Sequence, residues 1–472
     1  MTQINWMNEV LQRKEFLLTK CQELLSIPSV LDETTAQKGA PFGQEIARAL
    51  TYMLDLGQQD GFRTKNLDGY AGHIEMGEGE EDIGILTHID VVPAGNGWTS
   101  PPFSPEIRNG RLYARGAMDD KGPTMAVYVA MKIVKELGLP LSKRVRLILG
   151  TDEETKWRCM RHYFRYEKMP TMGFSPDADF PMIIGEKGLL SLKLVGSLTE
   201  PATQAGKWTL AEFTSGERLN LVPDLAVVKL TGEGDVFALK EAFQSYLVEH
   251  RLQGYAEESD DDVQLQLHGI AHHAFEPNKG LNAALAMARF LAELPLDPQG
   301  ARYIRLINER FVDSFFGEKL GIQQRDEWLG ELTLNAGIFR YRAGDVQQIS
   351  VNIRHPLSTD VDQLVSKIEK TAAEYQLRLE SIEHLPAHYI HEDHPLITIL
   401  STVYEQQTGE PARLLTTGGG TYARLLKTGV AFGPVFPGKV ETAHQCDEYI
   451  EIEDLLKATA IYAQAIYELA RS

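Results

Sequence analysis

The sequence predicts an α/β protein in which a mixed, largely parallel sheet is flanked by helices and an α+β domain is inserted into the first domain. Short apolar runs alternate with helical periodicity in the first part of the chain, the pattern changes near residue 186, and the first pattern returns near residue 386. The 472 residues suffice for two or three domains at roughly 150 residues each. We therefore expect a discontinuous domain, residues 1–185 and 386–472, and an inserted domain over 186–385.

The first elements follow from apolar spacing. Apolar residues from Asn5 to Leu25 recur at three and four positions, which predicts one amphipathic helix that ends before Pro28. A second helix is expected from about Gly43 to Leu56, ending near Gly57. The apolar run Ile83–Leu86 then predicts a buried strand.

The next three elements predict a βαβ unit. Residues 111–113 form a short strand, the turn at residues 115–123 opens a helix that runs to about Leu137, and residues 144–149 form a second strand. Strand, helix and strand in this order imply a parallel sheet with a right-handed crossover. In such sheets the site lies beyond the carboxyl ends of the strands.

The inserted domain and the last part of the chain differ in their elements. Between residues 186 and 385 strands alternate with helices in an α+β order; examples are strands 225–230 and 263–267 and helices 236–248 and 282–294. After residue 386 a helix at 395–407 is followed by a glycine turn and a strand at 430–433.

Composition excludes several kinds of partner. Asp plus Glu number 66 against 47 for Lys plus Arg, a net charge of −19 that repels nucleic acid and anionic lipid. No segment approaches the roughly 20 apolar residues that span a bilayer, and the charged N-terminus does not resemble a signal peptide. Three scattered cysteines indicate a reducing compartment. We expect a cytoplasmic protein without nucleic-acid or membrane partners.

The strongest local signal is His88-Ile89-Asp90 at the end of the predicted strand near residue 86. Because side chains alternate along a strand, His88 and Asp90 share one face. An imidazole with a carboxylate behind it suits a metal ligand whose tautomer is held. The same pattern also fits a buried histidine that is hydrogen-bonded to an aspartate, so the motif alone leaves both interpretations open.

Several candidate ligands are expected at the carboxyl ends of predicted strands, the last of them near the end of the chain. The candidates are His88, Asp90, Asp119, Glu153, Glu154, Asp177 and His444. So many carboxylates at one sheet edge repel one another unless cations lie among them. Two divalent cations, each held by one histidine and one carboxylate and sharing a bridging aspartate, resolve the conflict and suit zinc or manganese. Glu153 is then left over as a candidate general base.

Ordinary explanations exist for the single motifs. Asp119-Asp120-Lys121 also fits an acidic helix N-cap. Asp152-Glu153-Glu154 alone fits a solvated loop, and Gly418–Gly420 lacks the Gly-Lys-Ser/Thr of a phosphate loop. A second group of histidines lacks regular ligand spacing and is interpreted as an ordinary loop: His384, His388, His391 and His394.

The order and spacing of six motifs resemble the M20 metallopeptidase family over nearly the whole chain. The motifs are Gly84–Pro93, Arg115–Pro123, Thr151–Glu154, Ser175–Asp177, Gly269–Pro277 and Ala443–Gln445. Residues 173–181, 216–224 and 418–424 are similar to the bacterial dipeptidase branch called PepV. The resemblance implies a zinc-exopeptidase-like catalytic domain with an inserted lid. An insert of this length resembles the enlarged lid of that branch, which implies a monomer.

The resemblance also implies roles in the first domain. Asp119 bridges two ions, Zn²⁺ or Mn²⁺, and forms a cis peptide with Asp120. The further ligands are His88 and Asp177 for one metal, and Glu154 and His444 for the other. Asp90 orients His88, and Glu153 deprotonates the metal-bridging water before it protonates the leaving amine.

In the inserted domain the resemblance implies contacts with a dipeptide. His273 stabilises the oxyanion, Arg354 binds the free C-terminal carboxylate, and Asn220 contacts the substrate, as does Gly419 from the last part of the chain. We expect a dipeptidase; the alternatives are a deacylase or carboxypeptidase acting on N-acyl amino acids, or a peptide-binding protein without catalysis. Lys156, where the family pattern leads us to expect a small residue, flanks Glu153 and puts the level of activity in doubt.

Overall fold

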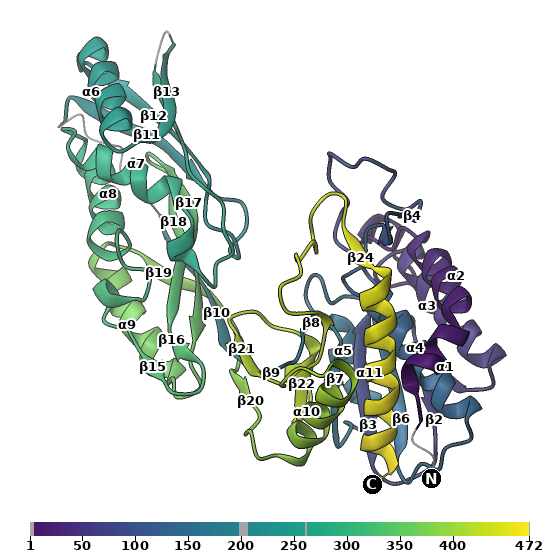
Figure 1. Ribbon diagram of the computed structural model, residues 1–472. Coiled ribbons are helices and arrows are strands. Elements are labelled where there is room, and N and C mark those ends of the chain that lie inside the picture. Colours follow the sequence, from purple (N-terminus) through teal and green to yellow (C-terminus); the bar gives the residue numbers. More distant parts are fainter. Residues whose placement is uncertain (1–3, 198–205, 260–261, 472) are drawn as a thin grey trace. The chain divides into compact units, whose positions relative to one another are not determined.

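The computed structural model describes residues 4–197, 206–259 and 262–471. The chain divides into two compact units, which are coloured along the sequence in Figure 1. Unit 1 comprises Met1–Gly185, Ile390–Thr416 and Gly420–Ser472, and unit 2 comprises Glu186–Tyr389 and Thr417–Gly419. Unit 1 is therefore discontinuous in sequence.

Unit 1 is built on a mixed sheet with the strand order β1-β2-β6-β3-β7-β22-β9. The strands are β1 (Arg63–Leu67), β2 (Ala71–Met76), β3 (Asp82–His88), β6 (Arg144–Gly150), β7 (Met172–Ser175), β9 (Met182–Glu186) and β22 (Gly429–Ala431). The central strands β6, β3, β7 and β22 are parallel, whereas β1, β2 and β9 pair antiparallel with their neighbours. The predicted mixed, largely parallel sheet is confirmed.

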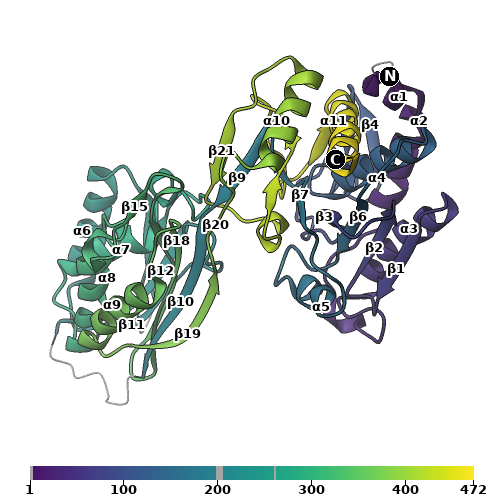
Figure 2. The same ribbon diagram turned by 90° about the horizontal axis from the view of Figure 1, so that it is seen from below.

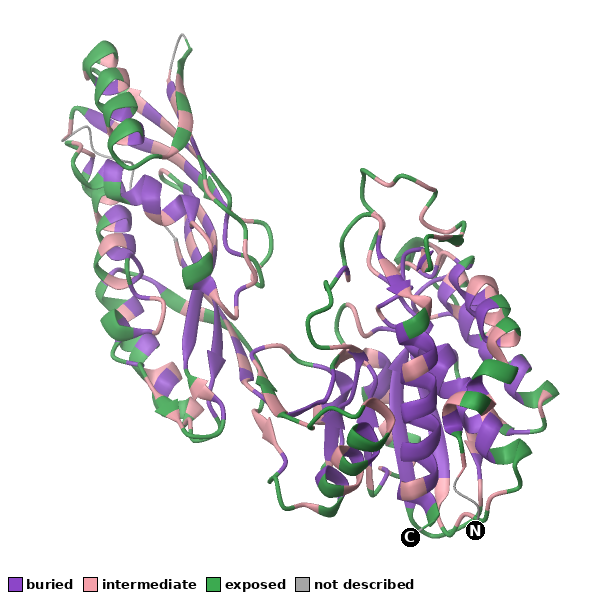
Figure 3. Cartoon of the chain, viewed as in Figure 1, coloured by how far each residue is buried: buried purple, intermediate pink, exposed green. Residues whose placement is uncertain are grey.

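Helices cover both faces of this sheet (Figure 2). They are α1 (Trp6–Gln12), α2 (Lys14–Leu25), α3 (Gln44–Gln59), α4 (Lys121–Glu136), α5 (Arg158–Tyr166), α10 (Pro395–Thr408) and α11 (Ile452–Arg471). α4 and α11 pack together on one face, and α5 and the short helix η4 (Tyr422–Leu425) pack on the other. α11 is buried around most of its circumference (Figure 3), as expected for a helix enclosed by α1, α4 and α10.

One helix prediction near the N-terminus was wrong, and a second helix runs two residues beyond its expected end near Gly57. The helix predicted from Asn5 to Leu25 is two helices, because the backbone of Arg13 leaves the helical region (φ −110°, ψ 10°). The break lets α1 pack on α11 while α2 packs on α4. Gly57 does not end α3 but lies inside it, where an added Cβ would stand 3.1 Å from the side chain of Ile74. The glycine permits close helix–strand approach instead of stopping the helix.

The predicted βαβ unit exists but begins two strands earlier than expected, at β3 instead of at residues 111–113. Residues Arg111–Tyr113 form β5, which belongs to a separate sheet of order β24-β5-β4 with β4 (Glu106–Arg108) and β24 (Tyr449–Glu451). The parallel partner of β6 is β3, so the crossover is β3-α4-β6. The hairpin β4-β5 is inserted between β3 and α4. Its second strand was assigned to the wrong sheet because a strand of three residues has no sequence pattern that identifies its partner.

Unit 2 is an eight-stranded sheet of order β13-β14-β12-β11-β17-β18-β10-β19 with helices along one face (Figure 1). The strands are β10 (Gly188–Ser197), β11 (Trp208–Ser215), β12 (Leu225–Gly232), β13 (Gln253–Glu258), β14 (Val263–His268), β17 (Thr333–Arg342), β18 (Val346–His355) and β19 (Arg378–Leu385). The helices are α6 (Val236–Glu249), α7 (Ala283–Ala292), α8 (Pro298–Arg310) and α9 (Val361–Glu374). All neighbours pair antiparallel, and one apolar core joins sheet and helices, which makes the unit α+β.

Short strands complete the two units. They are β8 (Ala178–Asp179), β15 (Arg325–Asp326), β16 (Gly330–Glu331), β20 (His388–Tyr389), β21 (Leu414–Thr417) and β23 (Pro434–Val435). Among the helices in the described part of the chain, none combines the length and the apolar character needed to cross a membrane.

Candidate metal centre

Most of the predicted ligands lie at the carboxyl ends of three neighbouring parallel strands of unit 1. His88 is the last residue of β3, Glu153 and Glu154 follow the end of β6, and Asp177 follows the end of β7. Because these strands run in the same direction side by side, their carboxyl ends meet. The predicted gathering of carboxylates around a histidine is therefore present in unit 1.

Two loops add Asp119 and His444. The peptide bond between Asp119 and Asp120 is cis, as the family resemblance implied, and His444 adopts a positive φ of 64°. Asp119 Oδ1 lies 2.9 Å from His88 Nε2, and Asp119 Oδ2 lies 3.0 Å from His444 Nε2. One aspartate thus places its two oxygens against two different histidines.

The remaining carboxylates complete the cluster. His444 Nε2 lies 3.2 and 3.1 Å from the two oxygens of Glu154, and His88 Nε2 lies 3.7 Å from Asp177 Oδ2. Two sets of three residues have ligand atoms within 4.8 Å of one another: His88, Asp119 and Glu154, and His88, Glu153 and Asp177. Either set has the nitrogen and oxygen donors that zinc or manganese accepts.

One buried atom supports a cation at this place. His88 is 1% exposed, and its Nε2 makes no well-aligned hydrogen bond to any residue that the structure describes. A buried imidazole nitrogen without such a bond is costly unless it serves another partner. Since this nitrogen faces Asp119 and Asp177, the residues fit a divalent cation.

Electrostatics at the centre are dominated by burial and by the histidine contacts. Burial raises the pKa of Glu153 and of Asp177 well above the usual carboxyl range. Hydrogen bonds with Asp119 and Glu154 raise the pKa of His444 to about 11. Burial also acts to raise the pKa of Asp119, but the close contacts of its two oxygens with His444 and His88 outweigh burial and lower the pKa of Asp119. A cation among these carboxylates favours their ionised forms.

Asp90 stands behind His88, as strand alternation predicts. His88 Nδ1 lies 3.0 Å from the backbone oxygen of Asp90 and 3.5 Å from its Oδ1. Both neighbours accept hydrogen bonds, so the Nδ1 proton is held and the Nε2 lone pair faces the cluster. Asp90 Oδ2 also accepts the backbone N–H of Glu154 at 3.1 Å, which connects the ends of β3 and β6.

Tyr422 lies in the segment 418–424 that resembles the family, but the sequence assigned it no role at the site. Its ring packs edge-on against His88 with centroids 6.3 Å apart, and its hydroxyl lies 2.9 Å from Cys159 Sγ. Gly150 makes room for this ring, because an added Cβ would stand 2.4 Å from it. Tyr422 follows the glycine run that ends at Gly420, and only the packing of η4 on the sheet shows its place.

Unit 2 holds the residues predicted to contact substrate. The backbone oxygen of the exposed Asn220 accepts the N–H of Ala274 at 2.9 Å, so Asn220 and His273 lie on adjacent segments. His273 Nδ1 accepts the backbone N–H of Phe275 at 3.2 Å. Phe275 in turn borders Gly418, where an added Cβ would stand 2.6 Å from it.

Arg354 and Gly419 lie next to the same segment of unit 2. Arg354 is 3% exposed, and it donates from Nη1 to Gly418 O and from Nε to Asn352 Oδ1, both at 2.8 Å. Gly419 donates its N–H to Thr417 Oγ1 at 3.0 Å. The contacts run from Asn220 through residues 273–275 and Gly418 to Arg354, so the four residues predicted for substrate binding belong to one region of unit 2.

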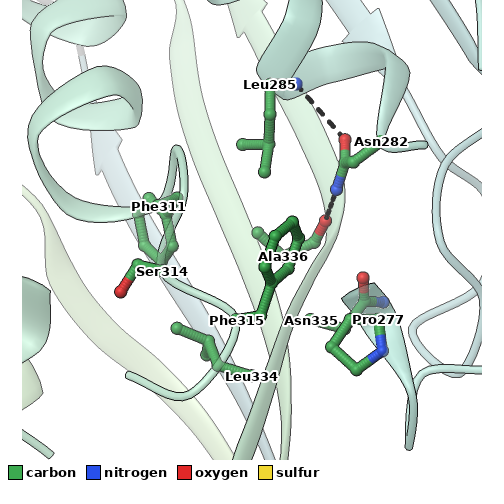
Figure 4. Close-up of a pocket in the computed structure, with 9 residues that line it drawn as sticks. All are labelled: Pro277, Asn282, Leu285, Phe311, Ser314, Phe315, Leu334, Asn335 and Ala336. Carbon is green, nitrogen blue, oxygen red and sulfur yellow. Dashed lines mark hydrogen bonds between the residues drawn. The ribbon is translucent and has the colours of Figure 1, made fainter. Parts of the chain in front are cut away.

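A small cavity lies beside this region, shown in Figure 4. Its volume is about 10 Å³, room for about one water molecule. Asn335, which lines it, donates from Nδ2 to the backbone oxygens of Leu219 and Leu221 at 3.0 and 2.8 Å, on either side of Asn220. Asn282 donates to Ala336 O at 2.9 Å. The pocket is too small for a dipeptide, and the amide of Asn335 supports the loop at Asn220.

The second group of histidines forms no group of three metal-ligating side chains among the described residues. His394 caps α10 by accepting the N–H of Leu396 at 3.1 Å, and His391 pairs with Asp393 at 2.6 Å. His384 Nε2 lies 3.1 Å from His355 Nε2.

Comparison with known proteins gives the class of this protein. Residues 84–468 match the model of "Peptidase family M20/M25/M40", so the chain belongs to this family. The protein is therefore a metal-dependent peptidase, a hydrolase.

Relatives cover the whole chain. It is 50% identical over 468 residues to "Putative dipeptidase YtjP" of Bacillus subtilis, with 99% of this chain and 100% of that protein covered. It is 38% identical over 465 residues to "Putative dipeptidase" of Staphylococcus epidermidis, with 98% and 99% covered.

Solved structures share the fold at low identity. They include the di-peptidase Dug1p of Saccharomyces cerevisiae (TM-score 0.59, 13% identity, 99% of this chain and 98% of that chain covered) and human carnosine dipeptidase 1 (TM-score 0.57, 16% identity, 99% of each covered). At these identities the likeness concerns the fold, which confirms the predicted fold class.

Proposed function

We propose that this protein is a dinuclear metal-dependent dipeptidase that hydrolyses dipeptides with a free C-terminal carboxylate. The observation that carries the proposal is the position of Asp119, whose two oxygens lie 2.9 Å from His88 Nε2 and 3.0 Å from His444 Nε2. A carboxylate between two imidazoles suits a shared ligand of two cations. The names of the relatives in Bacillus and Staphylococcus support the choice of dipeptides.

We propose Zn²⁺ or Mn²⁺ as the ions. Asp119 serves both, with the remaining ligands divided as His88 and Asp177 for one ion and Glu154 and His444 for the other. Bound there, the two ions would supply Lewis acidity for the attack of water on the peptide bond. Asp90 keeps the proton on His88 Nδ1, which leaves Nε2 as the ligand atom.

Glu153 is our candidate for the general base. It lies with His88 and Asp177 in one of the two sets of potential ligands, but the five proposed ligands do not need it. In this role its carboxylate takes a proton from the attacking water and later gives that proton to the leaving amine. Burial keeps its carboxyl in a poorly solvated place, where proton affinity is high enough for such a transfer.

In unit 2 the tautomer of His273 suits a donor role. Because Nδ1 accepts the Phe275 N–H, the proton of the neutral ring lies on Nε2. We propose that this N–H stabilises the oxyanion of the tetrahedral intermediate. Arg354, held by Gly418 and Asn352, is proposed to bind the substrate carboxylate, with weaker contributions from Asn220 and Gly419.

Metal removal tests the first part of the proposal. Exhaustive chelation is expected to abolish hydrolysis of a dipeptide, and added Zn²⁺ or Mn²⁺ is expected to restore it with a stoichiometry of about two ions per chain, because both Lewis acidity and the activated water are lost together. Turnover and metal content are measured on the same samples. Hydrolysis that survives complete removal of metal would show that the proposed chemistry is wrong.

Arg354→Ala tests carboxylate recognition. Hydrogen bonds to a charged group contribute about 1.5–3 kcal/mol, so the parent is expected to prefer a dipeptide over its C-terminal amide by about 10–100-fold in KM. The variant should lose this preference because its KM for the free dipeptide rises while its KM for the amide stays the same. Comparison with the N-acetylated amino acid separates a dipeptidase from a deacylase.

A matched control for this variant is Arg340→Ala. Arg340 lies on β17 of the same sheet and donates to the backbone oxygens of Ser215 and Gly216 at 2.7 Å each. Its loss should leave the preference for a free carboxylate intact. Equal cleavage of dipeptide and amide by the parent contradicts the role of Arg354.

We also propose that the protein is a monomer, from the length of the inserted segment, and that it is cytoplasmic, from its three scattered cysteines. Light scattering of the purified protein should give a mass close to 52.8 kDa.

A further inference from the structure

A buried glutamate outside the ligand set connects the two loops that carry Asp119 and His444. The side chain of Glu448 is fully enclosed in unit 1. Its Oε1 accepts the backbone N–H groups of Met118 and Asp119 at 2.9 and 3.2 Å. Its Oε2 accepts the N–H of Gly116 at 3.1 Å and Nη1 of Arg115 at 2.6 Å. Four donors thus converge on one carboxylate.

The loop of His444 is joined to the same group. Glu448 follows His444 by four residues, and its backbone oxygen accepts the N–H of Ala114 at 3.1 Å. Thr442 closes this loop by hydrogen bonds between its Oγ1 and the backbone of Tyr449, both at 3.1 Å. The loop that holds His444 is therefore anchored at both ends. One of the two anchoring residues, Glu448, also accepts the amide N–H of Asp119.

Arg115 extends the connection to a third loop. Arg115 is 1% exposed, and its Nη2 lies 3.4 and 3.3 Å from the backbone oxygens of Pro93 and Ala94. Its backbone N–H donates to Pro102 O at 2.9 Å. The residues after the strand of His88 are thus held by the same ion pair.

The buried ion pair of Glu448 and Arg115 is electrostatically unfavourable enough to suggest that it has a functional role. A further buried carboxylate near a cluster of acidic ligands is electrostatically unfavourable, and a buried ion pair rarely adds net stability over apolar packing. Apolar packing would hold these loops in place at a lower cost in free energy. The arrangement does, however, define where the backbone of Asp119 lies relative to His444, and a bridging ligand must be placed to within fractions of an ångström.

We propose that Glu448 is a positioning residue that sets the separation of Asp119 and His444 and thereby the affinity of the centre for its metal ions. This proposal rests on the proposed function of Asp119 and His444 as metal ligands. It assigns Glu448 no contact with substrate or metal.

The test is Glu448→Gln with Glu451→Gln as the matched control. The glutamine amide would point its N–H₂ at one pair of N–H donors, so that pair is lost while the volume is kept. Glu451 lies three residues further on and pairs at the surface with Arg111 at 3.2 Å. Zinc affinity is measured by competition with a chromophoric chelator, and the Co²⁺-substituted proteins are compared by their absorption spectra.

We expect Glu448→Gln to weaken binding of at least one zinc ion by about 10–100-fold and to change the Co²⁺ spectrum, with Glu451→Gln at parental values. A purely structural role predicts a lower melting temperature at unchanged zinc affinity, and that outcome overturns the proposal. If Glu448→Gln does not fold, Glu448→Asp, which keeps the charge but shortens the reach, must show the weakened affinity. A parent protein that binds no zinc or cobalt defeats the proposed function instead.

Discussion

Replacement of Glu153 by glutamine is expected to lower kcat for a dipeptide by about 10²–10⁴-fold while both metal ions stay bound. The glutamine keeps the shape of the side chain but cannot take a proton from the attacking water. Since Glu153 is not among the five proposed ligands, the metal content measured on the same sample should equal that of the parent. KM should change little, because the group acts on the proton and not on substrate binding.

Glu153→Asp serves as the control for this experiment. It retains a carboxylate but withdraws it by one methylene group, so we expect activity between that of the parent and that of Glu153→Gln. Parental turnover by Glu153→Gln with full metal content would exclude Glu153 as the base. Loss of metal from the same variant would instead show that Glu153 is a ligand, which its proximity to His88 and Asp177 allows.

Asp119→Asn is expected to have the second large effect, the loss of metal together with activity. Asp119 meets His88 through one oxygen and His444 through the other, so its conversion to an amide weakens both proposed sites at once. Metal ions supply several kcal/mol of transition-state stabilisation, which corresponds to a fall in kcat/KM of more than about 10²-fold. Metal content and turnover are both measured, and the two are expected to fall together.

The neighbouring Asp120→Asn is the matched control. Asp120 Oδ2 accepts the backbone N–H of His88 at 3.1 Å and lies 3.4 Å from Thr124 Oγ1, so its side chain supports β3 and α4. An asparagine oxygen can keep the bond to His88, and the variant should retain metal. Asp119→Asn with two tightly bound ions, or Asp120→Asn without metal, would contradict the assignment of the bridging role.

Much of the site was predictable because most of its residues follow the carboxyl ends of parallel strands. The apolar run before His88 and the strand that ends at Gly150 both mark the carboxyl ends of parallel strands, and parallel strands place such ends at one edge. The class of the sheet followed from the alternation of strands and helices, and the family followed from the six motifs that contain the candidate ligands. The choice of β3 over β5 as the partner of β6 was not predictable, because it depends on pairing across more than 50 residues of chain, and β-strand propensity does not encode a partner.

Helix ends were the other source of error. Gly57 has the sequence signature of a stop but serves as a contact surface for Ile74, and Arg13 interrupts a pattern that is otherwise continuous. In both cases packing against another element outweighs local propensity, since burial of apolar surface is worth more than the cost of one glycine or one helix break.

The kinds of ligand, their order along the chain, the acidic character of the surface and the fold class can all be predicted from local sequence patterns. The contacts of the two Asp119 oxygens with His88 and His444, and the binding of the neighbouring amides by Glu448, become visible only in the folded chain. Distances between residues more than 300 positions apart arise from the packing of the whole unit, and no local pattern encodes them.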